Sequence, residues 1–373
     1  MRVAIIAHLK HAIREPFAGG LEMHTYLLAQ SLRMRGHAVT LFASTQSDPA
    51  LGVEAICDEA SLLETGIAEA NDVAFFREHH AYLRLMGELR HRDFDVVHNN
   101  SLHYLPVSLA ETLATPILTT LHTPPFCWLE SGIRLCRSDA MRFVAVSAAT
   151  ARMWSHVAHI DRVVSNGIDL DHFPFRPVAD AAPYLVWYGR IVREKGLDLA
   201  IDAARIAGLP LRIAGPIADP AYFAAEIEPK LDGDTRYVGH LDHRALAALI
   251  GGACAALCTP RWEEPYGLVV AEALACGTPV AAFARGGVPD IVDARSGVLA
   301  IPDDTASLAE AAIAATGLSR ADCRERAVLT CNAETMIDAY EALYAEMIAA
   351  AVPPITIVRR AAAIPDLLLA GAA

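Results

Sequence analysis

Residues 184–196 read YLVWYGRIVREKG, an apolar run followed at once by a basic loop. The run is short and uninterrupted, which is typical of a strand buried on both faces of a parallel sheet. In an open α/β sheet, ligands bind beyond the carboxyl ends of the strands, and the loop places Arg190 and Lys195 there. A guanidinium and an ammonium both suit phosphate oxygens. The stretch therefore indicates an α/β fold with an anion site, although alone it also fits a surface loop with ordinary charges.

A second motif, EPYGLVVAE at residues 264–272, predicts the start of a short helix. Pro265 suits the first helical position, and Gly277 supplies a left-handed stop. The amides that lead this helix belong to Tyr266, Gly267, Leu268 and Val269. They have no intrahelical acceptors and carry the positive end of the helix dipole, so we expect a diphosphate to dock there.

Two carboxylates, Glu264 and Glu272, stand at either end of the same motif. Carboxylates accept hydrogen bonds from hydroxyl groups, so the pair would flank an extended ligand that carries both hydroxyls and phosphate. This spacing indicates a sugar attached to a phosphate. The alternative is a solvated acid at a helix N-terminus and a second acid on the exposed face of the helix.

Strand and helix patterns alternate along the chain, which predicts parallel sheets covered by helices. Strands are expected at residues 3–7, 38–43, 95–98, 116–121, 143–146 and 162–165, and then at 184–188, 211–214, 236–238, 255–258, 280–283 and 298–300. A length of 373 residues agrees with two domains. The proline-rich segment 171–183 is the expected linker, which gives domains at 1–177 and 178–334. A helix near 335–352 and an extension at 353–373 follow.

Together these motifs resemble the retaining nucleotide-sugar glycosyltransferases of GT-B architecture, in which two Rossmann-like domains face each other across a cleft. The shared pattern is Gly-Arg-x4-Lys-Gly at 189–196 followed by Glu-x7-Glu at 264–272. Further matching segments are 19–20, 166–169, 275–280 and 286–292. The resemblance spans about residues 1–345, and it implies that the final helix crosses back onto the first domain.

The resemblance also implies roles for the site residues. Arg190 and Lys195 would stabilise the leaving diphosphate, together with the backbone of residues 266–269. Glu272 would hold the ribose hydroxyls, and Glu264 would contact hydroxyls of the transferred sugar near the reacting carbon. Gly19 and Gly20 would let the first domain approach the donor, so that alanine there should hurt closure.

Histidines at strand ends are the remaining candidates. His122 follows the strand at 116–121, and the resemblance gives it contact with the sugar or a part in catalysis, whereas alone it would be read as structural. His98 is a weaker candidate for the acceptor side, and His8 and His103 rank lower. Glu22, near the start of the first long helix, is interpreted as an acid favoured by the helix dipole.

Composition excludes several classes of protein. A formal charge of −13 argues against nucleic-acid binding. Neither a Gly-x-Gly-x-x-Gly after the first strand nor a P-loop is present, so a dehydrogenase or P-loop enzyme is not expected. Two Asp-x-Asp motifs, at 93–95 and 169–171, lie at the wrong places for a diphosphate-bound ion. We therefore expect no metal and no cofactor.

Localisation is inferred from cysteines and hydropathy. The eight cysteines show no Cys-x2-Cys pairing, and no signal peptide or membrane-spanning run is evident, which indicates a cytoplasmic protein. Residues 77–92 predict a basic helix. It is either an ordinary solvated face or a peripheral contact with the inner face of a membrane or with a lipid-linked acceptor.

We interpret the chain as a metal-independent glycosyltransferase that moves a hexose from a nucleoside diphosphate sugar, a UDP-sugar or GDP-sugar, to a hydroxyl acceptor. The acceptor would be a glycan, a lipid-linked molecule or a small molecule. Retention of configuration is implied by the resemblance alone. Two alternatives stay open: a nucleotide-sugar epimerase or hydrolase on the same fold, and a non-catalytic partner that binds nucleotide sugar.

Overall fold

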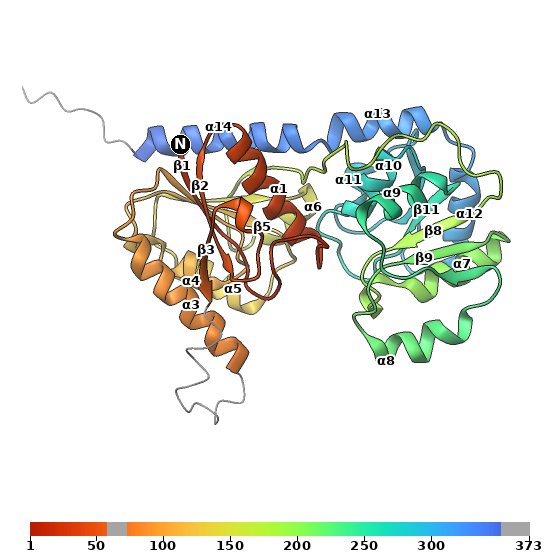
Figure 1. The fold of residues 1–373 in the computed structure, drawn as a ribbon, viewed down its shortest axis with the longest axis horizontal. Coiled ribbons are helices and arrows are strands. Elements are labelled where there is room, and N and C mark those ends of the chain that lie inside the picture. The colour runs from red at the N-terminus through yellow and green to blue at the C-terminus, as the bar shows by residue number, and fades with distance from the viewer. Residues whose placement is uncertain (58–72, 352–373) are drawn as a thin grey trace, which may run out of the picture.

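The computed structural model describes residues 1–57 and 73–351, which form two parallel β-sheets with helices on both faces of each (Figure 1). The first sheet contains β1 (Arg2–Ile6), β2 (Ala38–Ser44), β3 (Val53–Cys57), β4 (Val96–Asn99), β5 (Ile117–Leu121), β6 (Met141–Ala145) and β7 (Ile160–Val163). Its strand order is β3-β2-β1-β4-β5-β6-β7, and every neighbouring pair is parallel. The extension at 353–373 lies outside the described residues.

The second sheet contains β8 (Leu185–Tyr188), β9 (Leu211–Ala214), β10 (Thr235–Tyr237), β11 (Ala255–Cys258), β12 (Val280–Phe283) and β13 (Gly297–Ala300). Its order is β10-β9-β8-β11-β12-β13, again with parallel pairs throughout. In this sheet the strand order reverses between β8 and β11, and in the first sheet between β1 and β4. Such reversals mark the places where an open α/β sheet binds ligands.

The helices follow the strands as crossover connections. Those of the first half are α1 (Gly20–Met34), α3 (Val73–Leu89), α4 (Tyr104–Ser108), α5 (Cys127–Leu135) and α6 (Ala148–Trp154). Those of the second half are α7 (Leu197–Ala207), α8 (Pro220–Tyr222), α9 (His243–Gly252), α10 (Leu268–Ala275), α11 (Val288–Ile291), α12 (Thr305–Ala315), α13 (Arg320–Thr330) and α14 (Ala333–Ala351). Separate apolar clusters fill the two faces of each sheet, with α1 against one face of the first sheet and α3 and α4 against the other.

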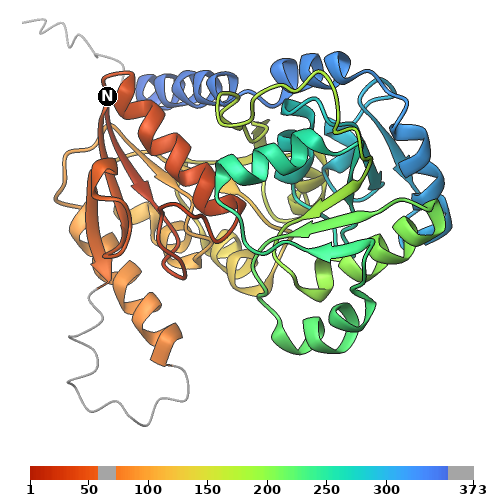
Figure 2. The same ribbon diagram turned by 45° about the vertical axis from the view of Figure 1, so that its right-hand side comes forward.

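Helix α14 crosses from the second half back onto the first sheet, as the resemblance implied (Figure 2). It packs beside α1 in one apolar cluster with strands β1 and β2. Its large buried side chains recur at helical spacing and are Met336, Ile337, Tyr340, Leu343, Tyr344 and Met347. The last helix of the described residues therefore belongs to the core of the first sheet.

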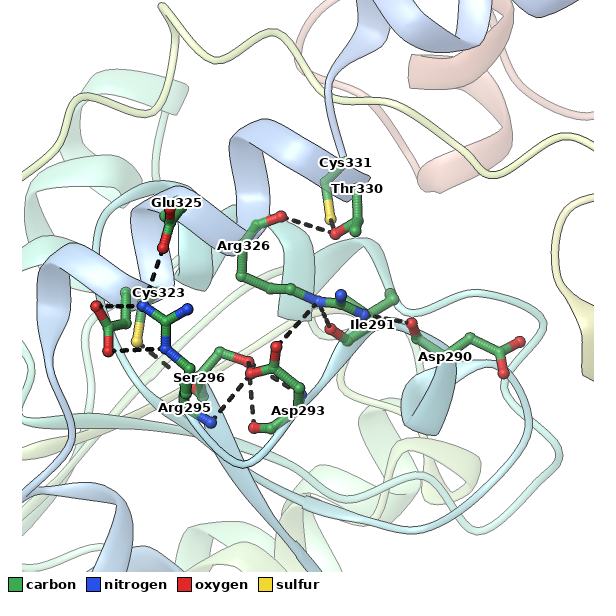
Figure 3. A network of polar contacts seen from close by, with 11 residues as sticks. Asp290, Ile291, Asp293, Arg295, Ser296, Cys323, Glu325, Arg326, Thr330 and Cys331 are labelled. Carbon is green, nitrogen blue, oxygen red and sulfur yellow. Dashed lines mark hydrogen bonds and ion pairs between the residues drawn. The ribbon is translucent and has the colours of Figure 1, made fainter.

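Arginine side chains connect α13 to α11 and to the loop that follows it (Figure 3). The Arg326 guanidinium donates to the carbonyl oxygens of Ile291 at 2.7 Å and Asp290 at 2.9 Å, and Arg295 pairs with carboxylates on α13. The Asp290 carboxylate accepts from the backbone amide of Ala148, the first residue of α6. The network thus joins α13 to α11 and α11 to the first half of the chain.

Two expectations about elements need correction. The sequence did not predict β3, an edge strand whose side chains are mostly half-buried, and it placed the start of β7 two residues too late.

In the described part of the chain, every helix is too short or too polar to cross a lipid bilayer.

Candidate active site

A cleft of about 790 Å³ lies between the carboxyl ends of the two sheets. It is lined by all the residues that the sequence assigned to the site: Gly19, Gly20, His122, Arg190, Lys195, Glu264, Tyr266, Gly267, Leu268, Val269 and Glu272. Residues of both halves face each other across it, because the loops that follow β1 and β5 meet those that follow β8 and β11.

The loop after β8 brings both cations to the cleft. Lys195 donates from Nζ to Oε2 of Glu264 at 2.6 Å, and its ammonium lies 5.2 Å from the ring centroid of Trp262. Arg190 is half-exposed and lies 3.9 Å from the carboxylate of Glu194. Arg190 is therefore free to turn toward a ligand, whereas Lys195 is held in place.

The loop after β11 is fixed by close backbone contacts. Gly286, at a φ of 57°, lies so near Glu264 that a Cβ there would stand 2.1 Å from the Glu264 carbonyl oxygen. The same oxygen accepts from the Gly287 amide at 2.7 Å. The Glu264 carboxylate also accepts from the Trp262 indole at 3.0 Å. Two glycines from the next strand connection therefore fix the backbone of Glu264, and Lys195 and Trp262 hold its carboxylate.

Helix α10 begins later than the sequence predicted. Its first residue is Leu268, preceded by Gly267 at a φ of 104°, so Pro265 lies before the helix rather than at its first position. The left-handed glycine turns the chain so that the amides of Leu268 and Val269 lead the helix at the cleft. The helix still ends as expected, with Gly277 at a φ of 81°.

Glu272 is buried on α10, not on an exposed face. Burial raises the pKa of its carboxyl to about 8, and the Tyr188 hydroxyl opposes this shift. No cation pairs with Glu272 in the described residues. At neutral pH the carboxyl of the unliganded protein is therefore mostly protonated.

Tyr266 contributes its backbone rather than its ring. The ring is 4% exposed and packs in the apolar cluster between α10 and α13. Its hydroxyl has no hydrogen-bond partner within residues 1–57 and 73–351. The side chain therefore anchors the loop between β11 and α10 to the core of the second half.

The first half supplies a close-fitting wall opposite α10. Gly20 opens α1 and faces Leu268 so tightly that a Cβ at Gly20 would stand 2.4 Å from Cδ1 of Leu268. A Cβ at Gly19 would stand 3.1 Å from a carboxylate oxygen of Glu22. The paired glycines thus permit the two halves to touch at this side of the cleft.

His122 lies on the same wall, at the end of β5. Its Nε2 lies 2.9 Å from Oδ1 of Asn100, so this nitrogen carries the proton when the amide oxygen accepts. Its ring meets the His24 ring edge-on at 4.6 Å. Burial, and then the nearby histidines His24, His98 and His8, lower the pKa of His122 well below its usual value, so the imidazole is neutral.

The structure corrects two other readings of the first half. His98 does not reach the cleft: its Nδ1 lies 2.5 Å from the Tyr344 hydroxyl and its Nε2 lies 2.7 Å from Oγ1 of Thr120. It joins the sheet to α14. Glu22 is more than a dipole-favoured acid, because it forms a buried pair with Nε2 of His8 at 2.5 Å.

Both members of this His8–Glu22 pair line the cleft. Burial works against ionisation of Glu22, but the hydrogen bond and charge of His8 outweigh it and hold the pKa of Glu22 below its usual value. The signal in the sequence was the place of His8 directly after the first strand, the same rule that selected His122.

The Asp-x-Asp motif at 93–95 lies away from the cleft, whereas Glu78 of the basic segment at 77–92 lines it. Asp93 and Asp95 both pair with Arg2 at the entrance of the first sheet. In the basic segment at 77–92, Arg84 pairs with Glu88, and Arg92 forms a bidentate pair with Glu54. These pairs neutralise part of the predicted cationic face, and contact with a membrane or a lipid-linked acceptor stays a prediction.

Two family models match the chain. Residues 171–328 match the family described as Glycosyl transferases group 1, and residues 18–172 match Glycosyltransferase Family 4. The chain is 29% identical over 339 residues to glycogen synthase of Mycobacterium tuberculosis, with 79% of this chain and 81% of the relative covered. It is 28% identical over 286 residues to a phosphatidyl-myo-inositol mannosyltransferase of the same organism, with 71% and 74% covered.

Solved structures resemble the whole fold. Sucrose-phosphate synthase from Thermosynechococcus elongatus aligns with a TM-score of 0.72 at 22% identity, covering 94% of this chain and 99% of that one. HepE of Anabaena in complex with UDP-glucose aligns with a TM-score of 0.70 at 16% identity, covering 94% and 100%. At these identities the likeness shows a shared arrangement of two parallel sheets around a cleft.

Proposed function

The chain belongs to the group 1 glycosyltransferases and has the GT-B fold, and on this premise we propose that it transfers a hexose from a nucleoside diphosphate sugar to a hydroxyl acceptor, without a metal ion and with retention of configuration. The acceptor class we propose is a glycan, a lipid-linked molecule or a small molecule. Relatives named as a glycogen synthase and a phosphatidyl-myo-inositol mannosyltransferase support hexose transfer, and the UDP-glucose complex of HepE supports the nucleotide donor.

One observation carries the proposal: Arg190, Lys195 and the leading amides of α10 converge on one cleft at the reversal of strand order. Breaking the bond between sugar and diphosphate places negative charge on the leaving group. Positive groups that are already in position stabilise such charge, by several kcal/mol each in a cleft that excludes water.

Lys195 can serve phosphate and sugar site together. Its ammonium has three donors, and one of them goes to Glu264. The other two are available to phosphate oxygens. Because Oε2 of Glu264 already accepts from Lys195 and Trp262, Oε1 is the atom offered to a sugar hydroxyl.

Glu272 suits a ribose diol. Hydroxyl donors favour the ionised form of a carboxyl, and Glu272 is a buried carboxyl at the cleft with a raised pKa. A ribose diol would supply hydrogen bonds that stabilise the ionised carboxylate. Across the cleft, we expect the neutral His122, which Asn100 holds, to contact the sugar.

Metal independence is supported by the charge already present. The two cations and the helix amides neutralise the leaving diphosphate, and both Asp-x-Asp motifs lie elsewhere in the fold. We therefore expect transfer to need no metal ion at the diphosphate.

The test begins with a panel of nucleotide sugars, read by thermal stabilisation, because a ligand that binds the folded state raises its melting temperature. The stabilising donor is then incubated with and without candidate acceptors. Transfer predicts that a glycosylated product forms only with an acceptor, with the anomeric configuration of the donor retained by NMR. Free or epimerised sugar from donor alone would instead indicate the hydrolase or epimerase, and binding without turnover would indicate a non-catalytic partner.

A further inference from the structure

A second cluster of ligand-type side chains lies at the rim of the cleft. Glu15 comes from the loop between β1 and α1, His172 from the connection between β7 and β8, and His243 is the first residue of α9. One ligand atom from each lies within 4.8 Å of the others. We propose that these three side chains bind a zinc ion that ties the two halves of the chain together.

The donor set fits zinc. Two imidazole nitrogens and one carboxylate oxygen are common zinc ligands, and a water completes four-coordination. At metal–nitrogen distances of about 2.0–2.1 Å, tetrahedral donors lie roughly 3.4 Å apart. Nδ1 of His243 and Oε1 of Glu15 are 3.7 Å apart already. Glu15 and His172 are about half-exposed, so their side chains can rotate over the remaining gap.

His243 is held ready for such a ligand. Its ring packs against Phe17 at 5.6 Å and against Phe173 at 6.0 Å, between centroids. Its Nδ1 is buried and makes no hydrogen bond within the described part of the chain. A buried nitrogen without a partner is costly, and coordination of a metal ion would remove that cost.

An outer carboxylate supports the second histidine. Oδ2 of Asp169 lies 3.5 Å from Nδ1 of His172. A carboxylate behind one ring nitrogen orients the imidazole and makes it a better ligand through the other nitrogen, a common arrangement at zinc sites. The zinc would therefore bind Nε2 of His172. Asp169, from the Asp-x-Asp motif at 169–171, would orient this histidine rather than bind a diphosphate-bound ion.

The ion would act on the arrangement of the halves rather than on transfer chemistry. The loop that carries Glu15 continues to Gly19 and Gly20 at the cleft, and α9 belongs to the second half. Zinc would fasten this loop to α9 and to the connection between the sheets. The inference is independent of the proposed transferase activity, and every measurement below is made without nucleotide sugar.

The test titrates metal-free protein with zinc by calorimetry, and with Co²⁺ by visible absorption as a reporter of four-coordinate geometry. One ion per chain is expected, with an intense Co²⁺ spectrum. Glu15→Ala, His172→Ala and His243→Ala should each weaken zinc binding by about tenfold or more, and Asp169→Asn by about 10-fold to 100-fold. His159→Ala removes an exposed histidine elsewhere and should leave binding unchanged.

Equal zinc affinity in the wild type and the three alanine variants would overturn the site, as would a weak six-coordinate Co²⁺ spectrum. His172 and Glu15 are solvent-facing, so their variants should fold, which circular dichroism checks. Anomalous diffraction from zinc-soaked crystals gives a second measurement: a peak between the three side chains supports the site, and zinc bound only elsewhere refutes it.

Discussion

Lys195 is the residue on which the proposed reaction depends most, because it contacts Glu264 and lines the cleft in which we propose that the diphosphate binds. Lys195→Ala should lower kcat by about 100-fold to 1000-fold, since it removes a charge that stabilises the leaving group. Donor affinity, measured by calorimetry, should fall much less. Lys230→Ala is the matched control, because Lys230 pairs with Asp202 away from the cleft and should keep wild-type kcat. Weaker donor binding with an unchanged kcat would assign Lys195 to binding alone.

Glu272 gives donor binding a dependence on pH. Its pKa is about 8 in the unliganded protein, so at pH 7 it is mostly protonated, whereas ribose hydroxyls favour its ionised form. Donor binding should therefore release a proton at pH 7, and affinity should rise by about tenfold between pH 7 and pH values above 8. Calorimetry in buffers with different heats of ionisation measures the proton directly.

Glu272→Gln is the control for this effect. The amide cannot ionise, so its donor affinity should be lower and flat with pH, and proton release should vanish. Proton release that persists in Glu272→Gln would mean that another group titrates on binding.

Gly20 tests how closely the two halves must approach. The Cβ of Gly20→Ala would displace the Leu268 side chain at the start of α10. Small misplacements at a reacting site are costly, so kcat/KM should fall by about tenfold to 100-fold. Gly87→Ala, within α3, meets nothing within 4 Å, so it should keep activity and raise stability by about 0.5–1 kcal/mol. Wild-type kcat/KM in Gly20→Ala would show that this contact is not needed.

At the scale of elements, the sequence predicted strands more accurately than helix starts. Buried parallel strands are continuous apolar runs, so β8, β9, β11 and β12 could be read directly. The start of α10 could not be predicted from the sequence in this way. Proline pointed to residue 265, but the chain turns at Gly267, and the preceding loop is fixed by Gly286 from another strand connection. That contact joins segments that are distant in the sequence, so no local sequence pattern predicts it. The edge strand β3 was missed because its half-buried residues give no clear period.

Helix α14 shows the same limit for a single residue. His98 follows the strand-end rule as well as His122 does, yet Tyr344, from a helix almost at the other end of the sequence, covers it. Tyr344→Phe would leave the buried Nδ1 of His98 without its partner. The free energy of unfolding in urea should fall by about 1–3 kcal/mol, with kcat unchanged because His98 does not line the cleft.

Tyr26→Phe is the control for this pair, because among the described residues the Tyr26 hydroxyl makes only a long, partly exposed contact of 3.5 Å with Asp48. Its effect on stability should stay below about 0.5 kcal/mol. A clear fall in kcat of folded Tyr344→Phe would contradict this prediction and would indicate that His98 takes part in the reaction.

At the scale of the whole molecule, the sequence indicated both sheets and one face of the cleft well, because the motifs after β8 and β11 are local. The residues of the opposite wall of the cleft are harder to predict from the sequence. Gly19, Gly20 and His122 were assigned through family resemblance, and the His8–Glu22 pair joins residues whose closeness depends on how α1 sits against β1. The cluster of Glu15, His172 and His243 draws on three separate segments, and for this reason it has no signature in the sequence.

The crossing of α14 makes the folding of the first sheet depend on residues that follow the second. Six buried side chains of α14 complete the core of the first sheet, at about 1.5–3 kcal/mol each. Their sum is on the order of 10 kcal/mol, comparable with the whole stability of a domain, about 5–15 kcal/mol. A chain ending at Thr330 should therefore lose amide protection in the first sheet, while hydrogen exchange in β8 to β13 stays slow.

A chain ending at Ala351 keeps every described helix and is the control for this truncation. It should show wild-type protection in both sheets. The shorter chain should also retain part of the donor's stabilising effect, because Arg190, Lys195 and Glu272 all belong to the second half, but it should have no turnover. Slow exchange in β1 to β6 of the chain ending at Thr330 would show instead that the first sheet folds without the helix that covers it.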